Sequence, residues 1–549
     1  MNQMKEIKPI YEVRKINNLR EMLDSSIELF ANNPAFKFKK DGEIITKTYS
    51  EFGSDVKALG TALIDLGLKD EHISVTGVNS YKWCVTYLAV VNGVGTIVPM
   101  DKAIPTIEIE NILAQSAPKA IICEAKYVDI LKSLQEKYGL KYIICMEAQE
   151  DENGVLSFDK LIEKGKKLLN KGNNSYLNAE IDNTLPKIML FTSGTTSKSK
   201  AVLLSHKNLC ANTMAISTVV KYKSDDVLLS VLPIHHTFEC LVTFITGLYN
   251  GSCIAFCEGL KHIGSNLKEF DISIFACVPA ILESIYSQLK KAKVSNGYED
   301  FSFVKKLYPH FRLAIVGAAS IDKNTVIAFN EMGISCQQGY GLTESSPVIS
   351  VETDICRCPG SIGLPLPGID IKIDNPNSEG IGEICAKGES IMLGYYNNEE
   401  ATNEVLENGW LHTGDLGYLD DNGFLFISGR KKTVIVLDNG KNVFPEEVEV
   451  ILNSNDEIVE SFVFAEKKDT RLELRAEIVY DKQHIKEKYG DVSEEEIYEI
   501  IDNVVRKTNK TLPLYKYIRK FIITTEPILK TTTNKIKRYA ELDKIKAVK

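Results

Sequence analysis

The first half of the chain alternates between helical and strand-like hydrophobic patterns, and this alternation constrains the fold more than any other feature. Apolar residues recur at helical spacing in residues 49–66 and 83–91, while short apolar runs at 72–78 and 95–99 are typical of buried strands. Strands that alternate with helices form parallel sheets, because each helix carries the chain back to the same end of the sheet. We therefore expect an α/β fold. The strand pattern returns at 119–123 and 313–316.

The chain is too long for one hydrophobic core, since single cores stop growing at about 250–300 residues and this chain has 549. After residue 360, prolines and glycines separate short strand-like runs such as 369–373, which predicts a β-rich lobe. A second change follows residue 429, where the pattern predicts a helix at 443–452, strands at 460–464 and 473–480, and a helix at 493–510. We expect a large multi-lobed domain followed by a small α+β domain.

Composition favours a cytoplasmic protein that does not bind nucleic acid. The net charge is −9, so the surface as a whole does not attract nucleic acid or anionic lipid. The twelve cysteines lie mostly in apolar segments, as buried reduced thiols do, and Cys356-x-Cys358 lacks a second pair at zinc spacing. The N-terminus has no signal-peptide core, and residues 240–257 divide into pieces shorter than the ~20 residues of a spanning helix. Peripheral contact with a membrane surface stays open.

Residues 192–201 have the composition of a phosphate-binding loop. They read Thr-Ser-Gly-Thr-Thr-Ser-Lys-Ser-Lys-Ala and follow the strand-like run 188–191. Backbone N–H groups and hydroxyls can donate to phosphate oxygens, and Lys198 and Lys200 add positive charge. The loop is not a Walker A loop, because that motif requires Gly-Lys-Ser/Thr after Gly-x-x-x-x and Ser199 stands five residues after Gly194.

Three further segments carry weaker signals. In residues 338–345, glycines flank Tyr340, whose ring can stack on a flat ligand, and Glu344 can hold a hard cation; a turn with a packed tyrosine is the alternative. Asp415 lies on a glycine-flanked turn that suits ribose hydroxyls, but ordinary surface turns look the same. Residues 515–549 hold ten Lys/Arg against three Asp/Glu, which is typical of a solvated face.

In their order, these four segments resemble the adenylate-forming superfamily, which includes acyl-CoA synthetases, nonribosomal-peptide adenylation domains and firefly luciferase. The resemblance runs from about residue 18 to residue 538, and it is greatest to fatty acyl-CoA synthetases. Additional matching segments are residues 232–236, 382–384, 394–395 and 429–432.

The resemblance implies a fold and a set of roles. It implies a large ATP- and acid-binding domain at 1–429, a hinge at 430–432 centred on Lys432, and a mobile C-terminal domain at 433–549 that carries the catalytic Lys535. Glu344 would bind Mg²⁺, Thr343 would contact the α-phosphate, and His236 would line the acyl pocket. The residues implied in ATP binding are Thr192, Ser193, Gly194, Thr195, Thr196, Lys200, Gly317, Ala318, Ala319, Gln338, Gly339, Tyr340, Gly341, Asp415 and Arg430.

The phosphate loop departs most from the family pattern. Ser197, Ser199 and Ala201 stand where the family has Gly, Pro and Gly, and Asn534 replaces the Gly before Lys535. A left-handed backbone at Ser197 or Ala201 would cost about 1–2 kcal/mol. Asn tolerates that conformation better than other non-glycine residues, so we expect Asn534 to let Lys535 reach the active site. Because Thr192–Thr196 and Lys200 match the family, we expect the loop to bind ATP, although more weakly.

The implied reaction uses ATP, Mg²⁺ and CoA to convert a carboxylic acid into acyl-AMP and then into a thioester. The apolar run 241–249 suits the tail of a medium- or long-chain fatty acid, and no fixed charge there would select an amino acid. Two alternatives remain: a ligase that loads an acyl carrier protein in trans, and a non-catalytic nucleotide or acyl-CoA sensor.

Overall fold

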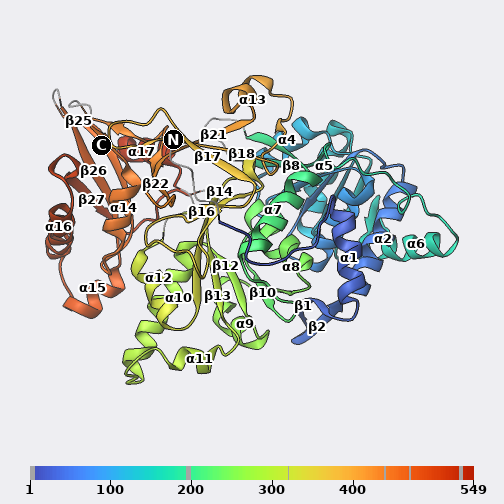
Figure 1. Cartoon of the computed structure of the whole chain (residues 1–549), viewed down its shortest axis with the longest axis horizontal. Helices are drawn as coiled ribbons and strands as arrows, with labels where there is room; N and C mark the ends of the chain where they lie inside the picture. Colours follow the sequence, from blue (N-terminus) through green and yellow to red (C-terminus); the bar gives the residue numbers. More distant parts are fainter. Residues whose placement is uncertain are drawn as a thin grey trace.

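The computed structural model describes residues 7–192, 199–319, 321–437, 441–468, 471–530 and 536–548. As Figure 1 shows, the chain runs from a helix-covered lobe through a β-rich middle section to a separate C-terminal domain, drawn in orange to red. The α/β class predicted from the sequence is confirmed. The domain limits at 1–429, 430–432 and 433–549 stay a prediction.

One eight-stranded sheet within the described residues is built mainly of parallel strands. Its order is β19-β9-β8-β4-β3-β5-β6-β7, and only the pairs that involve β9 are antiparallel. The strands are β3 (His72–Thr76), β4 (Thr96–Met100), β5 (Ala120–Cys123), β6 (Tyr142–Cys145), β7 (Val155–Ser157), β8 (Pro186–Thr192), β9 (Lys200–Ser205) and β19 (Gly394–Tyr395).

A second, nine-stranded sheet has the order β16-β15-β14-β13-β12-β10-β11-β1-β2, with a parallel centre and antiparallel edges. Its strands are β1 (Pro34–Lys40), β2 (Glu43–Thr48), β10 (Val227–Ser230), β11 (Cys253–Phe256), β12 (Ile274–Cys277), β13 (Leu313–Val316), β14 (Ser335–Gly341), β15 (Val348–Val351) and β16 (Leu364–Pro365). Segments from both sheets share one hydrophobic core, which Phe36, Ile73 and Ile274 illustrate.

Helices connect and cover these strands. Thr48 starts the second helix with a capping box, because its hydroxyl accepts from the Glu51 N–H while the Glu51 carboxylate accepts from the Thr48 N–H. The helices are α1 (Leu19–Phe30), α2 (Tyr49–Asp65), α3 (Tyr81–Ala89), α4 (Thr106–Ser116), α5 (Val128–Tyr138), α6 (Phe158–Asn170), α7 (His206–Val219), α8 (Thr246–Tyr249), α9 (Ile263–Glu269), α10 (Pro279–Ser295), α11 (Phe303–Leu307) and α12 (Lys323–Glu331). No helix of the described residues is long and apolar enough to cross a membrane.

The β-rich lobe predicted after residue 360 is a five-stranded sheet in the described part of the chain, with the order β17-β18-β21-β20 and β22 paired to β21. The elements are β17 (Ile369–Asp374), β18 (Gly382–Gly388), α13 (Glu399–Val405), β20 (Leu406–Glu407), β21 (Trp410–Leu419) and β22 (Leu425–Arg430). Ile384 and Leu411 join the core of the two larger sheets, so this lobe is packed against them.

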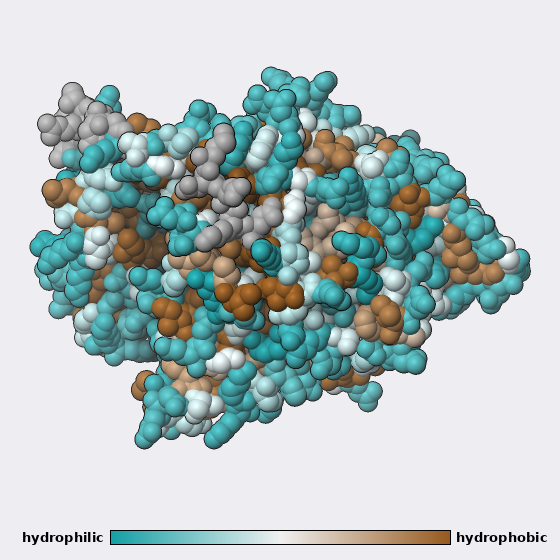
Figure 2. Space-filling model, in the orientation of Figure 1, coloured by the Kyte–Doolittle hydropathy of each residue, from teal (hydrophilic) through white to brown (hydrophobic). Residues whose placement is uncertain are grey.

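The C-terminal domain has its own hydrophobic cores. A three-stranded sheet, β25-β26-β27, is flanked by helices, which confirms the expected α+β character. The elements are β23 (Ile435–Val436), β24 (Asn442–Val443), α14 (Pro445–Asn453), β25 (Ile458–Lys468), β26 (Arg471–Tyr480), α15 (Lys482–Tyr489), α16 (Glu494–Thr511), β27 (Ile518–Thr524) and α17 (Arg538–Val548). The face in Figure 2 is mainly hydrophilic over this domain and over the large domain alike.

A buried histidine makes the large domain sensitive to acid. His206 is fully buried at the start of α7; its Nδ1 accepts from the Leu19 N–H (3.1 Å) and its Nε2 lies 3.0 Å from the Val91 carbonyl oxygen. Burial lowers the pKa of His206 to about 4. Below pH ~6.5 the unfolded chain therefore binds a proton at this histidine, whereas the folded chain does so only near pH 4. As the pH is lowered between these two values, the free energy of unfolding decreases by about 1.4 kcal/mol per pH unit.

We expect acidification from about pH 6.5 to about pH 5 to lower the free energy of unfolding by about 2 kcal/mol through this group. The substitution His206→Gln should flatten that part of the pH dependence, whereas His262→Gln, at an exposed histidine, should leave it unchanged. Urea unfolding followed by tryptophan fluorescence measures the effect, because Trp83 and Trp410 both lie in the large domain. An equal loss of stability with pH in both variants would contradict this assignment.

Candidate active site

The two ends of the predicted phosphate loop are held together by strand pairing. Thr192 ends β8 and Lys200 begins β9, and the two residues are direct partners, with the Thr192 hydroxyl donating to the Lys200 carbonyl (3.3 Å). Ser193, Gly194, Thr195 and Thr196, which were predicted to bind phosphate, lie outside the described residues, as does Ser197. Ala201 pairs with Phe191 inside extended β9. The left-handed strain considered at this position therefore does not arise.

Lys200 lies in a row with Tyr395 and Glu344. The Lys200 ammonium is 4.8 Å from the centroid of the Tyr395 ring, and the Tyr395 hydroxyl donates to Glu344 Oε1 (2.9 Å). Burial and the Glu344 carboxylate raise the pKa of Tyr395, so its hydroxyl stays protonated and can donate. Pairing of β19 with β9 places Tyr395 here, because Tyr395 is the partner of Val202. A cation, a phenol and a carboxylate thus converge from three segments.

The predicted adenine-binding segments are adjacent at the ends of β13 and β14. A Cβ atom at Gly317 would lie 3.4 Å from the Gly339 carbonyl oxygen and 3.2 Å from the Phe238 ring, so little space separates the two backbones. Ala318 has a left-handed backbone (φ +71°), and both Ala318 and Ala319 are exposed. A Cβ at Gly341 would lie 1.8 Å from the Pro347 carbonyl oxygen, so only glycine fits there. Gln338 donates to Glu352 (3.2 Å).

Asp415 is held by the two residues predicted to share its site. The Tyr340 hydroxyl donates to Asp415 Oδ2 (2.7 Å), and Arg430 Nε donates to Asp415 Oδ1 (2.7 Å). Tyr340 and Asp415 are buried, whereas the Arg430 side chain is half exposed. Burial and the Asp415 charge raise the pKa of Tyr340 well above its usual value, which keeps the phenol a donor. The nine-stranded sheet and the β-rich lobe therefore meet at one carboxylate.

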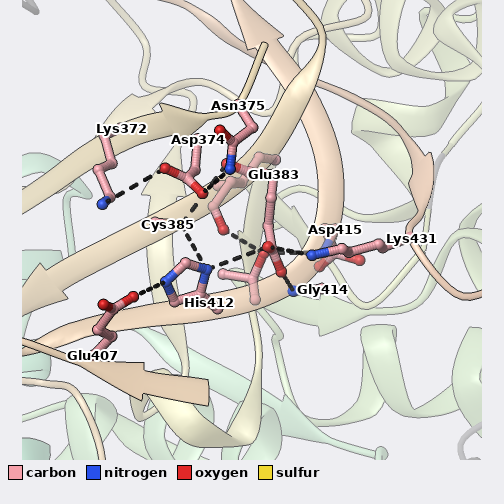
Figure 3. A network of polar contacts seen from close by, with 12 residues as sticks. Lys372, Asp374, Asn375, Glu383, Cys385, Glu407, His412, Gly414, Asp415 and Lys431 are labelled. Carbon is pink, nitrogen blue, oxygen red and sulfur yellow. Dashed lines mark hydrogen bonds and ion pairs between the residues drawn. The ribbon is translucent and has the colours of Figure 1, made fainter. Parts of the chain in front are cut away.

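A bulge in β21 presents Asp415. The register with β18 shifts between Glu383 and Cys385, and Gly414 in the bulge has φ +72°. The Gly414 N–H donates to Glu383 Oε1 (3.1 Å), and the Thr413 hydroxyl both donates to the Ile384 carbonyl (2.7 Å) and accepts from the Asp415 N–H (3.1 Å). In Figure 3 the Glu383 carboxylate contacts Gly414, His412 and Lys431.

The predicted acyl-pocket residue His236 lies beside His235, with ring centroids 4.0 Å apart. Burial lowers the pKa of His235 to about 3, so this imidazole is neutral. A cavity of about 10 Å³ adjoins His235, which is room for roughly one water molecule. The run 241–249, expected to suit an aliphatic tail, is buried in the large core, and its first residue, Leu241, also lines this cavity. A helix that is apolar all round is typical of a buried core position, so the role of this run toward the acid stays a prediction.

Thr343 and Glu344 lie in a short 3₁₀ turn (Thr343–Ser345) after β14, and both are half buried. Lys432, the predicted hinge residue, is an exposed residue in the turn after β22. The N–H groups of Thr433 and Val434 both donate to the Arg430 carbonyl in this turn.

Lys535 lies outside the described residues, but the chain on either side of 531–535 is held firmly. Lys530 and Ile536 form an antiparallel bridge, and the Lys537 N–H donates to the Leu529 carbonyl (2.8 Å). Arg538, at the start of α17, donates to the buried Glu449 carboxylate (2.6 Å). The loop that carries Lys535 therefore has a closed base anchored to α14.

Sequence reasoning assigned no role to Tyr395 or Glu383, which lie inside two of the segments that match the family. Tyr395 connects Lys200 with Glu344, and Glu383 supports the bulge that presents Asp415. The only sequence signal for these residues was their position inside segments 382–384 and 394–395. Their side-chain contacts depend on strand pairing between segments that are distant in the chain. No local pattern of spacing reveals them.

The chain is similar along most of its length to known ligases. The chain is 27% identical over 528 residues to long chain acyl-CoA synthetase 4 of Arabidopsis thaliana, covering 85% of this chain and 78% of the relative. It is 27% identical over 545 residues to 4-coumarate–CoA ligase 1 of the same plant, covering 95% and 91%. Among solved structures, the anthranilate CoA ligase AuaEII in complex with anthranoyl-AMP superposes with a TM-score of 0.79 at 21% identity, covering 99% of both chains.

The family matches cover both parts of the molecule. Residues 23–396 match the AMP-binding enzyme family, and residues 432–547 match the AMP-binding enzyme C-terminal domain. The second match begins at Lys432, where the turn after β22 leads into the C-terminal domain. With this match across most of the chain, and with the Lys200–Tyr395–Glu344 row beside the Tyr340–Asp415–Arg430 cluster, the protein belongs to the AMP-binding, adenylate-forming enzyme family.

Proposed function

We propose that the protein is an ATP-dependent acid–CoA ligase that activates a medium- or long-chain fatty acid. The observation that carries the proposal is the convergence of Lys200, Tyr395 and Glu344 at the mouth of the phosphate loop. A cation and an oriented carboxylate beside that loop suit a magnesium-bound polyphosphate. The fatty-acid part rests on the resemblance to long-chain acyl-CoA synthetases, since the apolar run 241–249 belongs to the core.

The reaction has two steps. A carboxylate oxygen attacks the α-phosphorus of ATP, the bond to the bridging oxygen breaks, and pyrophosphate leaves. The CoA thiol then loses its proton to solvent and attacks the acyl carbon, and AMP leaves with the electrons of the acyl–oxygen bond. The first step depends mainly on positioning and charge neutralisation, because a negatively charged carboxylate must approach the negatively charged phosphates of ATP.

Residues on the phosphate side hold the leaving group. Thr192, Lys200 and the loop residues Ser193–Thr196 would contact the β- and γ-phosphates, and Thr343 the α-phosphate. Glu344 fits Mg²⁺, because its half-buried carboxylate is a hard oxygen ligand that Tyr395 already orients. When bound, the ion would neutralise charge on the phosphates. Lys535 would act between the carboxylate and the α-phosphate.

The adenosine would lie over the adjoining ends of β13 and β14, where Gln338–Gly341 would place Tyr340 against one face of the base and Gly317–Ala319 would close the other. The exposed Arg430 and the Asp415 carboxylate would take the ribose hydroxyls. Asp415 reaches the ribose through the β21 bulge that Glu383 supports. Lys432 would be the pivot that withdraws Lys535 after the first step and opens the way for the thiol of CoA.

Two other functions stay in view. An acyl- or aryl-acid ligase that loads an acyl carrier protein would share the first step and differ only in the thiol. A nucleotide or acyl-CoA sensor would need neither the Glu344 metal site nor Lys535. The organisation of Tyr395 around Glu344 favours an enzyme, because a sensor gains nothing from an oriented metal ligand.

A panel of carboxylic acids tests the function directly. We expect ATP-dependent pyrophosphate release with saturated fatty acids of medium or long chain, more slowly with coumarate, anthranilate or malonate, and thioester formation once CoA is added. Release of pyrophosphate followed by transfer only to acyl carrier protein would favour the carrier-loading alternative. ATP binding without pyrophosphate release for any acid would overturn the proposal in favour of the sensor.

Lys535 should be required for adenylation and not for thioester formation. We expect Lys535→Ala to slow pyrophosphate release by about 10²–10³-fold, the usual effect of removing a group that stabilises developing charge, while synthetic acyl-AMP plus CoA still gives thioester. The matched control is Lys537→Ala, at an exposed neighbour whose backbone N–H bond is retained. Near-parental adenylation in Lys535→Ala would show that the lysine has another role.

Tyr395 should set the affinity for Mg²⁺ through its hydrogen bond to Glu344. We expect Tyr395→Phe to raise the Mg²⁺ concentration needed for half-maximal pyrophosphate release by about tenfold, since hydrogen bonds to charged groups contribute about 1.5 kcal/mol or more. Tyr396→Phe is the control at the adjacent position, where the ring contacts His72. If both variants need the same Mg²⁺ concentration as the parent, Tyr395 does not orient Glu344.

A further inference from the structure

One face of the β-rich lobe gathers side chains that bind transition metals. Asp374 on β17 pairs with Glu383 on β18, and Cys385 on β18 pairs with His412 on β21. Side chains two apart on a strand share a face, and so do cross-strand partners. Strand geometry alone therefore puts all four on one face of the sheet, and Figure 3 shows them together.

The donor atoms converge on the Nδ1 atom of His412. Glu383 Oε2 lies 3.2 Å from this nitrogen and Cys385 Sγ lies 3.4 Å from it. One oxygen of Asp374, one of Glu383 and one ring nitrogen of His412 all lie within 4.8 Å of one another. The thiol also lies 3.8 Å from the Glu383 carbonyl oxygen, which accepts from it. A carboxylate oxygen, an imidazole nitrogen and a sulfur atom that lie this close together are all groups that bind a divalent cation.

The two separations measured from His412 Nδ1 agree with tetrahedral zinc. With Zn–N and Zn–O bonds of about 2.05 Å and a Zn–S bond of about 2.3 Å, tetrahedral angles separate nitrogen from oxygen by about 3.3 Å and nitrogen from sulfur by about 3.6 Å. The two observed separations are within about 0.2 Å of these values. Side-chain adjustments of that size are small for a protein site.

Two further contacts surround these donor atoms. The other ring nitrogen of His412, Nε2, lies 3.7 Å from Glu407 Oε2, and a small movement of this exposed carboxylate would let it accept from the ring N–H, as carboxylates do beside metal-bound histidines. Glu383 uses its other oxygen, Oε1, to accept from the Gly414 N–H, so metal on Oε2 would leave the Asp415 bulge supported. The site and the ATP-binding groups can therefore be filled together.

Lys431 now supplies the positive charge at this position. Its ammonium lies 2.9 Å from Glu383 Oε2, the same oxygen that faces His412. The Lys431 side chain is 62% exposed, whereas that of Glu383 is 10% exposed, so the lysine can turn into solvent while the carboxylate stays. Lys372, 3.9 Å from Asp374, is a second cation that a metal would compete with.

We propose that Asp374, Glu383, Cys385 and His412 form a binding site for a borderline divalent cation of the zinc class, which displaces the Lys431 ammonium. The soft thiolate and the imidazole select such ions over Mg²⁺, which prefers oxygen alone. Binding transfers the Cys385 thiol proton to solvent, and the resulting thiolate and two carboxylates neutralise the dication. This site is separate from the proposed Mg²⁺ ligand Glu344 and does not depend on the proposed reaction.

Cobalt(II) replaces zinc and reports its ligands by absorption. We expect the full-length protein, stripped with chelator, to bind one Co²⁺ with the intense visible bands of tetrahedral coordination and a near-ultraviolet thiolate-to-cobalt band, and Zn²⁺ to abolish both. Cys385→Ser should remove the thiolate band, and Asp374→Asn, at the more exposed ligand, should weaken binding at least about tenfold, as loss of even an outer partner of a metal ligand does. Cys356→Ser is the control.

Lys431→Met is the decisive variant, because it removes the competing cation without touching a ligand. We expect it to tighten Co²⁺ binding several-fold, and thermal unfolding of each variant verifies that it is folded. The proposal is overturned if the parent shows only the weak bands of octahedral Co²⁺, if Cys385→Ser keeps the thiolate band, or if Lys431→Met binds no more tightly than the parent. Since these readouts use no substrate, they are independent of the proposed ligase activity.

Discussion

The Asp415 carboxylate is the point on which the large domain depends. A buried carboxylate is costly unless it is paired and hydrogen-bonded, and here the partners come from different parts of the chain. Tyr340 belongs to the nine-stranded sheet, whereas Arg430 ends the β-rich lobe directly before the C-terminal domain. The pairing therefore fixes the lobe against the sheet, and it places the groups proposed for adenosine at the start of the turn that leads to the second domain.

A comparable junction joins the two larger sheets. β19 comes almost two hundred residues after β9, yet it pairs with it and delivers Tyr395 between Lys200 and Glu344. Lys200, at the end of the predicted phosphate loop, and the proposed metal ligand Glu344 are thus connected through a two-residue strand. The site therefore depends on contacts among all three lobes, since each lobe contributes only part of it.

Periodicity predicted the elements well and their partners poorly. The helix at 49–66 and the strands at 119–123 and 313–316 appear as α2, β5 and β13, since apolar spacing reports burial directly. The split of 240–257 into helix and strand is also confirmed. The aliphatic role expected of 241–249 stays a prediction, because an apolar run cannot tell whether it faces a ligand or the rest of the core. Neither can a spacing rule show that Glu383 contacts Gly414, His412 and Lys431.

The sequence by itself determined the α/β class, the small C-terminal domain, the membership in the AMP-binding family and the segments that carry its motifs. These features depend on the order of residues within short segments, which can be read from the sequence without knowing which segments are in contact. Tertiary structure alone decided that Tyr395 orients Glu344, that Glu383 supports Asp415, and that Cys385 and His412 face each other. Such contacts arise from strand register between segments distant in the chain, and a shift of one residue would turn each side chain to the opposite face of its sheet.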